Sequence, residues 1–438
     1  MKVKVIGAGL AGCEAAAQLS ARGFAVELYE MKPRKYSPAH KYSGFAELVC
    51  SNSLKAARVE SACGLLKEEM RRLGSVILRA AEKTSVPAGG ALAVDREQFS
   101  DEVTRIISAD PNITVISGEV TELPAENAVI CTGPLTSDAL AEKLRSLCGQ
   151  GLSFYDAAAP IVTAESIDLT KAFFQTRYDK GDADYINCPM TREEYDAFYE
   201  ALINAESAPL KEFDRPAESA GMRVYEGCMP VEVLAKRGAE SVRYGCMKPV
   251  GLTDPRTGRR PYAAVQLRKE NREGTMYNLV GFQTNLKFGE QKRVFSMIPG
   301  LENAQFVRYG VMHRNTFIDS PRLLDGHFML RGSRNIFFGG QITGVEGYVE
   351  SAASGIAAGR ALADRLSGRE PLTFPRTTML GALSAYISDP SVTDFQPMGS
   401  NMGILPPLEE AVKGKQEKYA AYARRALEDL DRALGGNI

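Results

Sequence analysis

The sequence predicts an α/β fold in which a dinucleotide-binding domain is interrupted by a second domain. Residues 1–32 have the pattern of a strand, a glycine-rich turn, a helix and a second strand. Residues 125–135 and 334–366 each contain a further apolar strand that runs into a glycine-containing turn. Because such strands share one parallel sheet in nucleotide-binding folds, we expect residues 1–150 and 310–438 to form one discontinuous domain. Residues 151–309 would then be an inserted α+β domain.

The first segment carries a dinucleotide fingerprint. A short apolar strand is followed by Gly7, Gly9 and Gly12 in the pattern GxGxxG, and the next strand, AVELYE, ends in Glu30. The first two glycines allow a tight turn close to a pyrophosphate, the third lets the helix pack on the strand, and the acid can accept hydrogen bonds from a ribose. A tight turn without a ligand is the alternative. The cofactor contacts predicted here are Gly7, Ala8, Gly9, Leu10, Ala11, Gly12 and Glu30.

Two later segments favour FAD over NAD as the dinucleotide. The strand in AENAVICTGPL (125–135) ends in Thr-Gly, similar to the ATG segment of flavoproteins with two dinucleotide sites. The segment 334–366 is a strand, a glycine-rich turn and a helix of small residues. It resembles the segment that closes over the flavin in the glutathione-reductase class, so we expect a glutathione-reductase-like, Rossmann-type FAD domain. Gly340 and Gln341 in its turn are further predicted cofactor contacts.

The inserted region combines strands with a helix and contains a cysteine in an unusual setting. Residues 159–166 and 275–286 are typical of strands, and residues 191–205 of a helix whose aromatic stripe is best explained as core packing. Cys228 stands between the strand RVYEG and a helix predicted over VEVLAKRG, with Pro230 at an early helical position. The positive end of that helix would favour a thiolate at Cys228, whereas a small core residue is the ordinary alternative.

Composition excludes several classes of protein. The net charge is −1, so binding of a nucleic acid would depend on a local basic patch. The eight cysteines form no CxxC pair and only three histidines occur, which argues against a zinc site. We find no signal segment and no apolar run of membrane-spanning length. These observations lead us to expect a cytoplasmic protein with reduced thiols and without a metal.

Motifs along nearly the whole chain carry a family resemblance. In order, they are GAGLAGCEAA, FAELVCSNSL, VPAGGALAVDR, YEGCMPVE, MKPVGLTDPRTG, YNLVGFQTNLK, GEQKRVF, GVMHRNTF, GGQITGVEGYVES and FQPMGSNMGILPPL. With them the chain resembles the folate- and FAD-dependent tRNA (uracil-5-)-methyltransferases, which are related to the larger GidA flavoproteins. One departure is Cys246, where the family usually has proline, and it adds a potentially reactive thiol.

The resemblance implies an activity and its participants. Methylenetetrahydrofolate would supply a one-carbon unit, and reduced FAD the electrons that turn it into a methyl group. The product would be 5-methyluridine at position 54 of the T-loop of tRNA, NAD(P)H would reduce the flavin, and no stable protein partner is implied. Cys228 would be the nucleophile that adds to uracil C6, and Cys50 would transfer a proton at C5 or contact the flavin.

The resemblance also assigns roles to several polar residues. His313 would stack on the folate pterin, and Glu346 would accept hydrogen bonds from the pterin amino groups. Asn285, Lys287 and Arg96 would contact folate, flavin or substrate. From the residues alone, the preferred explanation of His313 is a structural histidine. An acid at the start of a helix and ordinary surface polar side chains are the alternatives for the others.

Binding of tRNA would have to use local positive charge. The predicted phosphate contacts are Arg256, Arg259, Arg260, Lys287, Lys292, Arg293, Lys413 and Lys415. Each of these side chains is more often part of a solvated face. The remaining cysteines are best explained as structural residues: Cys13, Cys63, Cys131, Cys148 and Cys188.

Three other functions fit parts of the sequence. A GidA-like enzyme that modifies the wobble uridine would be expected to have a much longer chain with a helical C-terminal region. A tRNA-binding module that keeps the flavin without catalysis would need no pair of thiols such as Cys228 and Cys50. A plain flavin oxidoreductase is the weakest of the three.

Overall fold

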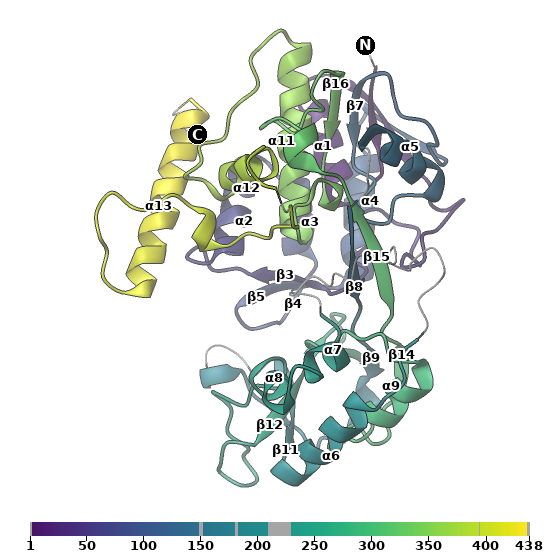
Figure 1. Cartoon of the computed structure of the whole chain (residues 1–438), viewed down its shortest axis with the longest axis vertical. Helices are drawn as coiled ribbons and strands as arrows, with labels where there is room; N and C mark the ends of the chain where they lie inside the picture. The colour runs from purple at the N-terminus through teal and green to yellow at the C-terminus, as the bar shows by residue number, and fades with distance from the viewer. Residues whose placement is uncertain (1, 149–151, 180–182, 209–228, 394, 436–438) are drawn as a thin grey trace.

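The computed structural model describes residues 2–148, 152–179, 183–208, 229–393 and 395–435. It has two lobes, one above the other in Figure 1, and both chain termini belong to the upper lobe. The upper lobe is built on a five-stranded parallel sheet in the order β16-β7-β1-β2-β6. Its strands are β1 (Lys2–Ile6), β2 (Ala25–Glu30), β6 (Ile113–Ser117), β7 (Glu126–Ile130) and β16 (Arg334–Phe338).

The sheet confirms the predicted α/β class and joins distant parts of the sequence. Strand β16 lies beside β7 in parallel, with Phe337 opposite Val129. The last strand of the sheet therefore comes from a segment more than two hundred residues beyond β7 in the chain. The expected discontinuity is thus present, while the domain limits at residues 150 and 309 stay predictions.

Two helices that cover the sheet pack closely against each other because small residues line their contact. They are α1 (Leu10–Ser20), which follows the glycine turn, and α11 (Tyr348–Leu366), which follows β16. A Cβ atom at Gly355 would lie 2.1 Å from the carbonyl oxygen of Ala11, and one at Gly359 would lie 2.7 Å from that of Ala15. Neither position accepts a side chain, which explains the small-residue composition of the helix predicted within residues 334–366.

The remaining helices of the upper lobe are α2 (Ala62–Arg72), α3 (Val76–Lys83), α4 (Arg96–Ser108), α5 (Asp138–Cys148), α10 (Ser320–Leu323), α12 (Met379–Ile387) and α13 (Lys415–Ala433).

Two buried carboxylates cap helices of this lobe. Glu69 of α2 accepts from the amides of Met379 (2.7 Å) and Leu380 (2.9 Å) at the start of α12. Glu14 of α1 accepts from the amide of Ile77 (3.0 Å) in α3. Burial raises the pKa of each acid to about 7, although these hydrogen bonds oppose the shift.

The lower lobe is built on an antiparallel sheet with the order β10-β11-β12-β13-β9-β14. Its strands are β9 (Ile161–Thr163), β10 (Phe173–Phe174), β11 (Tyr185–Met190), β12 (Ala263–Lys269), β13 (Met276–Leu279) and β14 (Phe306–Arg308). Its helices are α6 (Arg192–Ile203), α7 (Val231–Ala235), α8 (Ala239–Tyr244) and α9 (Phe288–Phe295). Thr191 forms a capping box with Glu194, and Tyr195, Phe198 and Leu202 are buried, so the aromatic stripe of α6 is core packing.

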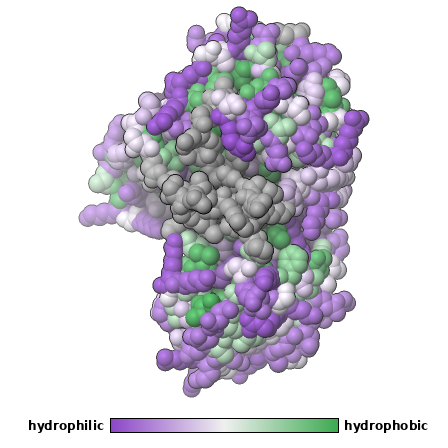
Figure 2. All heavy atoms as spheres, turned by 45° about the vertical axis from the view of Figure 1, so that its right-hand side comes forward, coloured by the Kyte–Doolittle hydropathy of each residue, from purple (hydrophilic) through white to green (hydrophobic). Residues whose placement is uncertain are grey.

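Smaller sheets link and extend the lobes. Strands β8 (Leu152–Ala157) and β15 (Met312–Phe317) pair antiparallel and run between the two lobes (Figure 1). Strands β3 (Ser53–Ala56), β4 (Ser85–Val86) and β5 (Ala91–Val94) form a three-stranded sheet in the upper lobe. The surface in Figure 2 is largely hydrophilic, with hydrophobic side chains gathered in small patches. Within the described ranges, no helix combines the length and apolarity needed to cross a membrane.

Candidate functional site

The glycine turn after β1 forms one wall of a pocket in the upper lobe. Gly7 has a φ of +95°, and a Cβ atom there would lie 2.6 Å from the carbonyl oxygen of Cys131. A Cβ atom at Gly12 would lie 1.7 Å from the carbonyl oxygen of Gly7, whereas one at Gly9 would meet no atom within 4 Å. Gly7 and Gly12 are therefore required by the packing of the chain on itself. Gly9 faces the pocket, where only a ligand would need the space.

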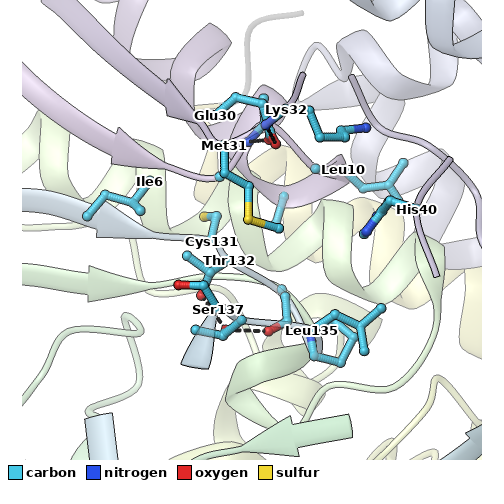
Figure 3. A pocket seen from close by; sticks show the side chains of 18 of the residues that line it. Ile6, Leu10, Glu30, Met31, Lys32, His40, Cys131, Thr132, Leu135 and Ser137 are labelled. Carbon is cyan, nitrogen blue, oxygen red and sulfur yellow. Dashed lines mark hydrogen bonds between the residues drawn. The ribbon is translucent and has the colours of Figure 1, made fainter. Parts of the chain in front are cut away.

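Glu30 closes the turn from the end of β2. Its carboxylate is buried and accepts from the amides of Ala8 (2.8 Å) and Lys32 (2.9 Å). Each carboxylate oxygen has a second lone pair, so both can also accept from hydroxyl groups of a ligand in the pocket. Glu30 and its neighbours point into this pocket in Figure 3.

Most of the predicted cofactor contacts in the upper lobe line this pocket. They are Gly7, Ala8, Gly9, Leu10, Ala11, Glu30, Gly340 and Gln341. Gly340 lies in the turn after β16 with a φ of +87°, and its amide donates to Ser354 (2.7 Å). Gln341 donates to the carboxylate of Glu346 (2.6 Å), which places Glu346 next to the lining without being part of it.

The pocket also contains residues that the sequence analysis missed. Thr132 and Thr136, from the segment after β7, share a hydrogen bond of 2.6 Å. His40 also lines the pocket (Figure 3) and shares a 2.6 Å hydrogen bond with Ser37, and burial lowers its pKa. Lys32 is buried and donates to the carbonyl oxygen of Gly44 (2.6 Å). The Thr-Gly motif after β7 was a usable signal for the first pair, but no local pattern indicated His40 or Lys32.

The pocket offers the groups that a dinucleotide such as FAD requires. A dinucleotide needs backbone amides for its pyrophosphate and an acceptor for its ribose. The first-turn amides of α1 have no partner within the helix, and the open space beside Gly9 adjoins them. Glu30 supplies the acceptor. The pocket therefore fits the adenosine diphosphate part of FAD.

Cys50 lies directly beside this pocket in a segment held by side chains from several elements. The hydroxyl of Tyr348, which lines the pocket, accepts from the amides of Cys50 (2.8 Å) and Ser51 (3.2 Å). Burial and the nearby Cys50 thiol raise the pKa of Tyr348. Arg96 donates to the carbonyl oxygen of Cys50 (3.3 Å), and Arg308 to that of Val49 (2.6 Å). The half-buried Cys50 thus has its backbone fixed on both sides.

Positive charge surrounds the same segment. Arg268 donates to the side chains of Asn52 (3.0 Å) and Ser51 (2.8 Å), and burial lowers its pKa. Arg96 also forms an ion pair with the buried Glu270. Arg96 therefore has protein partners for its guanidinium group, and its predicted contact with a cofactor stays a prediction.

Asn285 and Lys287, also predicted contacts, lie in the lower lobe near α9. The amide of Asn285 donates to the buried Glu232 (2.7 Å), and its side chain to the carbonyl oxygen of Ala208 (3.1 Å). Lys287 forms an ion pair with Glu206. The structure does not bring Asn285 and Lys287 to the lining of the dinucleotide pocket.

The predicted nucleophile Cys228 lies outside the described residues. The described chain resumes just after it, where the amide of Val231 donates to the carbonyl oxygen of Gln283 (2.7 Å). The predicted helix after Cys228 is present as α7, but it comprises only five residues, with Pro230 as its N-cap. The expected effect of this helix terminus on the Cys228 pKa stays a prediction. His313 pairs with Asp156 through the backbones of β15 and β8, and its predicted pterin contact stays a prediction.

The other cysteines behave as structural residues where the structure describes them. Cys13, Cys63, Cys131 and Cys188 are buried. Burial raises the pKa of the Cys246 thiol to about 12, which disfavours the thiolate, and the expectation of a reactive thiol at Cys246 stays a prediction. In the described ranges no cluster of three or more His, Cys, Asp or Glu side chains could hold a metal ion.

The basic residues predicted to contact RNA are exposed but lie in different regions. Arg259 and Arg260 are in the loop before β12 in the lower lobe, whereas Lys413 and Lys415 are at the start of α13 in the upper lobe (Figure 1). Arg256 is paired with Asp254 at 2.8 Å. A continuous phosphate track through these residues stays a prediction.

Comparison with known proteins places the chain in a family. The family model for glucose inhibited division protein A matches residues 2–370. A protein of Heliobacterium modesticaldum named methylenetetrahydrofolate–tRNA-(uracil-5-)-methyltransferase TrmFO is 60% identical over 440 residues, which cover 100% of this chain and 99% of the relative. The chain belongs to the TrmFO family, within the wider GidA family. A TrmFO of Halalkalibacterium halodurans is 57% identical over 429 residues, which cover 98% of this chain and 97% of the relative.

Solved structures agree with the TrmFO assignment at the level of the fold. Aquifex aeolicus GidA in its form II crystal superposes with a TM-score of 0.69 at 16% identity, covering 99% of this chain and 73% of that chain. The two-lobed architecture with a parallel nucleotide-binding sheet is therefore shared with GidA.

Proposed function

We propose that this protein transfers a methyl group to C5 of a uridine in tRNA. Methylenetetrahydrofolate would be the one-carbon donor, FAD the bound cofactor and NAD(P)H the reductant. The target would be position 54 of the T-loop, and the enzyme would act in the cytoplasm with its tRNA substrate. The single observation that carries the proposal is the shared wall formed by Tyr348, which lines the dinucleotide pocket and holds the backbone of Cys50. Such a wall would bring a flavin and a thiol into one site.

The residues that would hold FAD are those with backbone and carboxylate groups facing the pocket. The amides at the start of α1, beside Gly9, would bind the pyrophosphate, and Glu30 would accept from the ribose. The turn at Gly340 and Gln341 would cover the remainder of the cofactor. When bound and reduced, FAD would supply the two electrons that convert a methylene group into a methyl group.

The protein side chains would make uracil C5 reactive and then release the product. The Cys228 thiolate would add to C6, forming a carbon–sulfur bond and moving the electron pair of the C5–C6 double bond toward C5. C5 would then form a bond to the one-carbon unit, and a base would remove the C5 proton, for which Cys50 is the candidate. The bond from that carbon to its carrier nitrogen would break as tetrahydrofolate leaves, and with a hydride supplied by reduced FAD the carbon would become a methyl group. Re-formation of the C5–C6 double bond would expel the Cys228 thiolate unchanged.

The folate and tRNA contacts are proposed for the remaining residues. His313 and Glu346 would bind the pterin, and Glu346 already lies beside the pocket through Gln341. Arg259, Arg260 and Lys413 would meet tRNA phosphates, which their exposure allows.

The test is a reconstituted reaction with a mapped product. Purified protein should show a flavin spectrum, and it should methylate unmodified tRNA only when methylenetetrahydrofolate and NADPH or NADH are both supplied. Mass analysis of nuclease fragments should place the added 14-dalton methyl increment, which is the mass of one CH₂, in the T-arm. A product at the wobble position would favour a GidA-type reaction instead, and a flavin-free protein would overturn the proposal.

A further inference from the structure

Three aromatic rings are stacked almost parallel at the start of α9 in the lower lobe. The ring of Tyr309 lies between those of Phe288 (centroid distance 4.9 Å, interplanar angle 17°) and Phe306 (5.2 Å, 11°). Elsewhere in this lobe the buried rings of Phe282 and Phe295 meet at 80°, whereas Tyr195 and Tyr199 are stacked at 20°. The outermost ring, Phe288, is 56% exposed. A phenylalanine with an open ring face at the end of a stack is unusual, because this residue type is normally buried.

Hydrogen bonds and close packing fix the backbone that follows Tyr309. The buried side chain of Gln291 in α9 accepts from the amide of Gly310 (2.8 Å) and donates to its carbonyl oxygen (2.8 Å). A Cβ atom at Gly310 would lie 2.6 Å from the carbonyl oxygen of Ala158, so the chain after Tyr309 packs without room for movement. The backbone beside Tyr309 is therefore pre-organised, and a flat ligand would not have to order it on binding.

A hydrogen bond connects the segment of the stack to the Cys50 segment. Arg308, the neighbour of Tyr309 in the sequence, donates to the carbonyl oxygen of Val49 at 2.6 Å. Val49 lines the dinucleotide pocket and precedes Cys50. Phe288 stacks on Tyr309, so a ligand on its open face would lie next to the segment that contacts the candidate site.

The local charge permits a phosphate beside the rings. Lys287 and Arg293 are paired with Glu206 and Glu290 respectively, and Lys292 is a further exposed cation on α9. Two carboxylates against three cations leave a net charge of +1 around the stack. This balance suits one nucleotide better than a long run of phosphates, and the rings rather than the charges would dominate binding.

We propose that the exposed face of Phe288 is a stacking platform for an unpaired base of the tRNA substrate. The inference rests on the proposed function, because it takes tRNA to be the substrate. A uridine that leaves its loop stack to react disrupts the stacking of neighbouring loop bases, and an open aromatic ring can receive one of them. Any base has a π-face, so the platform would add affinity without selecting a sequence.

The experiment uses the FAD-bound enzyme and exploits the absence of tryptophan from the chain. Phe288→Trp would introduce a single fluorophore whose emission should be quenched when a base stacks on it. Phe174→Trp, at another phenylalanine that is 47% exposed, is the matched control and should not respond to tRNA. Phe288→Leu keeps an apolar side chain without a ring, and Phe174→Leu controls for that change.

The expected result is a selective loss of tRNA affinity. Stacking on one base is worth about 1–3 kcal/mol, so Phe288→Leu should raise the Kd for tRNA roughly 5- to 150-fold, whereas Phe288→Trp should keep it. The slope of log Kd against log salt should not change, since no phosphate contact is removed. Reduction of the flavin by NADPH without tRNA should match the wild type and serve as the check on folding.

Two outcomes would overturn the stacking proposal. One is an unchanged Kd in Phe288→Leu, which would also be expected if the stack served a protein partner. The other is tRNA binding by Phe288→Trp without quenching. These outcomes are independent of the proposed function, which fails instead if the wild-type enzyme binds tRNA but transfers no methyl group to it.

Discussion

Replacing Gly9 by valine should abolish FAD binding and leave the apoprotein folded. The backbone at Gly9 has a φ of −76°, which any residue can adopt, and a Cβ atom there would meet no protein atom within 4 Å. The new side chain would therefore fit the apoprotein but occupy the space beside the first-turn amides of α1. It would displace the pyrophosphate from those amides.

The loss can be estimated from the hydrogen bonds that would be broken. A hydrogen bond to a charged group contributes about 1.5–3 kcal/mol, so loss of two would cost about 3–6 kcal/mol. This corresponds to a Kd for FAD that is roughly a hundredfold to ten-thousandfold higher. Flavin content after purification and flavin fluorescence during reconstitution measure it directly.

Two further valine substitutions separate binding from folding. Gly12→Val would place a side chain on the carbonyl oxygen of Gly7, where a Cβ atom would lie only 1.7 Å away, and should lower the melting temperature of the apoprotein. Gly90→Val adds the same side chain in open space outside the pocket and should change neither property. The reasoning fails if Gly9→Val protein retains wild-type flavin affinity, or if its FAD-free form melts as early as Gly12→Val.

Three other predictions concern catalysis, tRNA binding and pH. Cys228→Ser should retain FAD and tRNA while losing methyl transfer by several orders of magnitude and forming no adduct with 5-fluorouridine tRNA; unaffected transfer would make Cys50 the next candidate nucleophile. The wild-type affinity for tRNA should fall with salt, and Arg259→Ala with Arg260→Ala should reduce the log–log slope by about 1.4–1.8, the value for two phosphates; a flat wild-type response would exclude the basic track. Burial raises the pKa of Glu69 in the folded state to about 7. Between about pH 4.5 and 7 the folded protein therefore holds a proton on Glu69 that the unfolded chain has lost. The contribution of protonated Glu69 to stability is complete below about pH 4.5 and is lost as the pH rises through 7. Chemical unfolding of Glu69→Gln should accordingly depend less on pH between 5 and 8 than that of the wild type, and equal pH slopes would contradict the assignment.

The elements that were predicted well are those fixed by short-range pattern. The strand AVELYE is β2 with the predicted bounds, Ala25–Glu30, because its alternation and the flanking turn residues leave no competing register. The tight turn at Gly7 and the close packing at Gly12 also followed from the sequence, since each depends on a turn only a few residues long. The presence of β16 and β7 in one parallel sheet was also expected, but which strand lies beside which was not predicted.

The contacts that were missed join residues far apart in the chain. Tyr348 was part of a quoted motif, yet nothing local indicates that its hydroxyl accepts from the amide of Cys50, 298 residues away. The capping of α12 by Glu69 spans 310 residues and contradicts the usual exposure of glutamate. Periodicity reports which face of an element is buried, but it does not report which distant element covers that face.

The placement of Cys50 shows why these long-range contacts matter for the proposed chemistry. Its segment is held by Tyr348 from α11, by Arg96 from α4 and by Arg308 from the sheet of the lower lobe. A thiol fixed by one element alone would follow the motion of that element, and a misplacement of about 1 Å can cost about a hundredfold in rate. Because both lobes contribute a hydrogen bond to the same few backbone groups, the position of the Cys50 thiol depends on how the lobes are docked. Arg96, for which the sequence predicts a ligand contact, is also part of this frame. Its partner Glu270 comes from just beyond strand β12 of the other lobe. The geometry of the candidate site is thus a property of the whole fold, and the glycine turn that first indicated a function supplies only the cofactor's half of it.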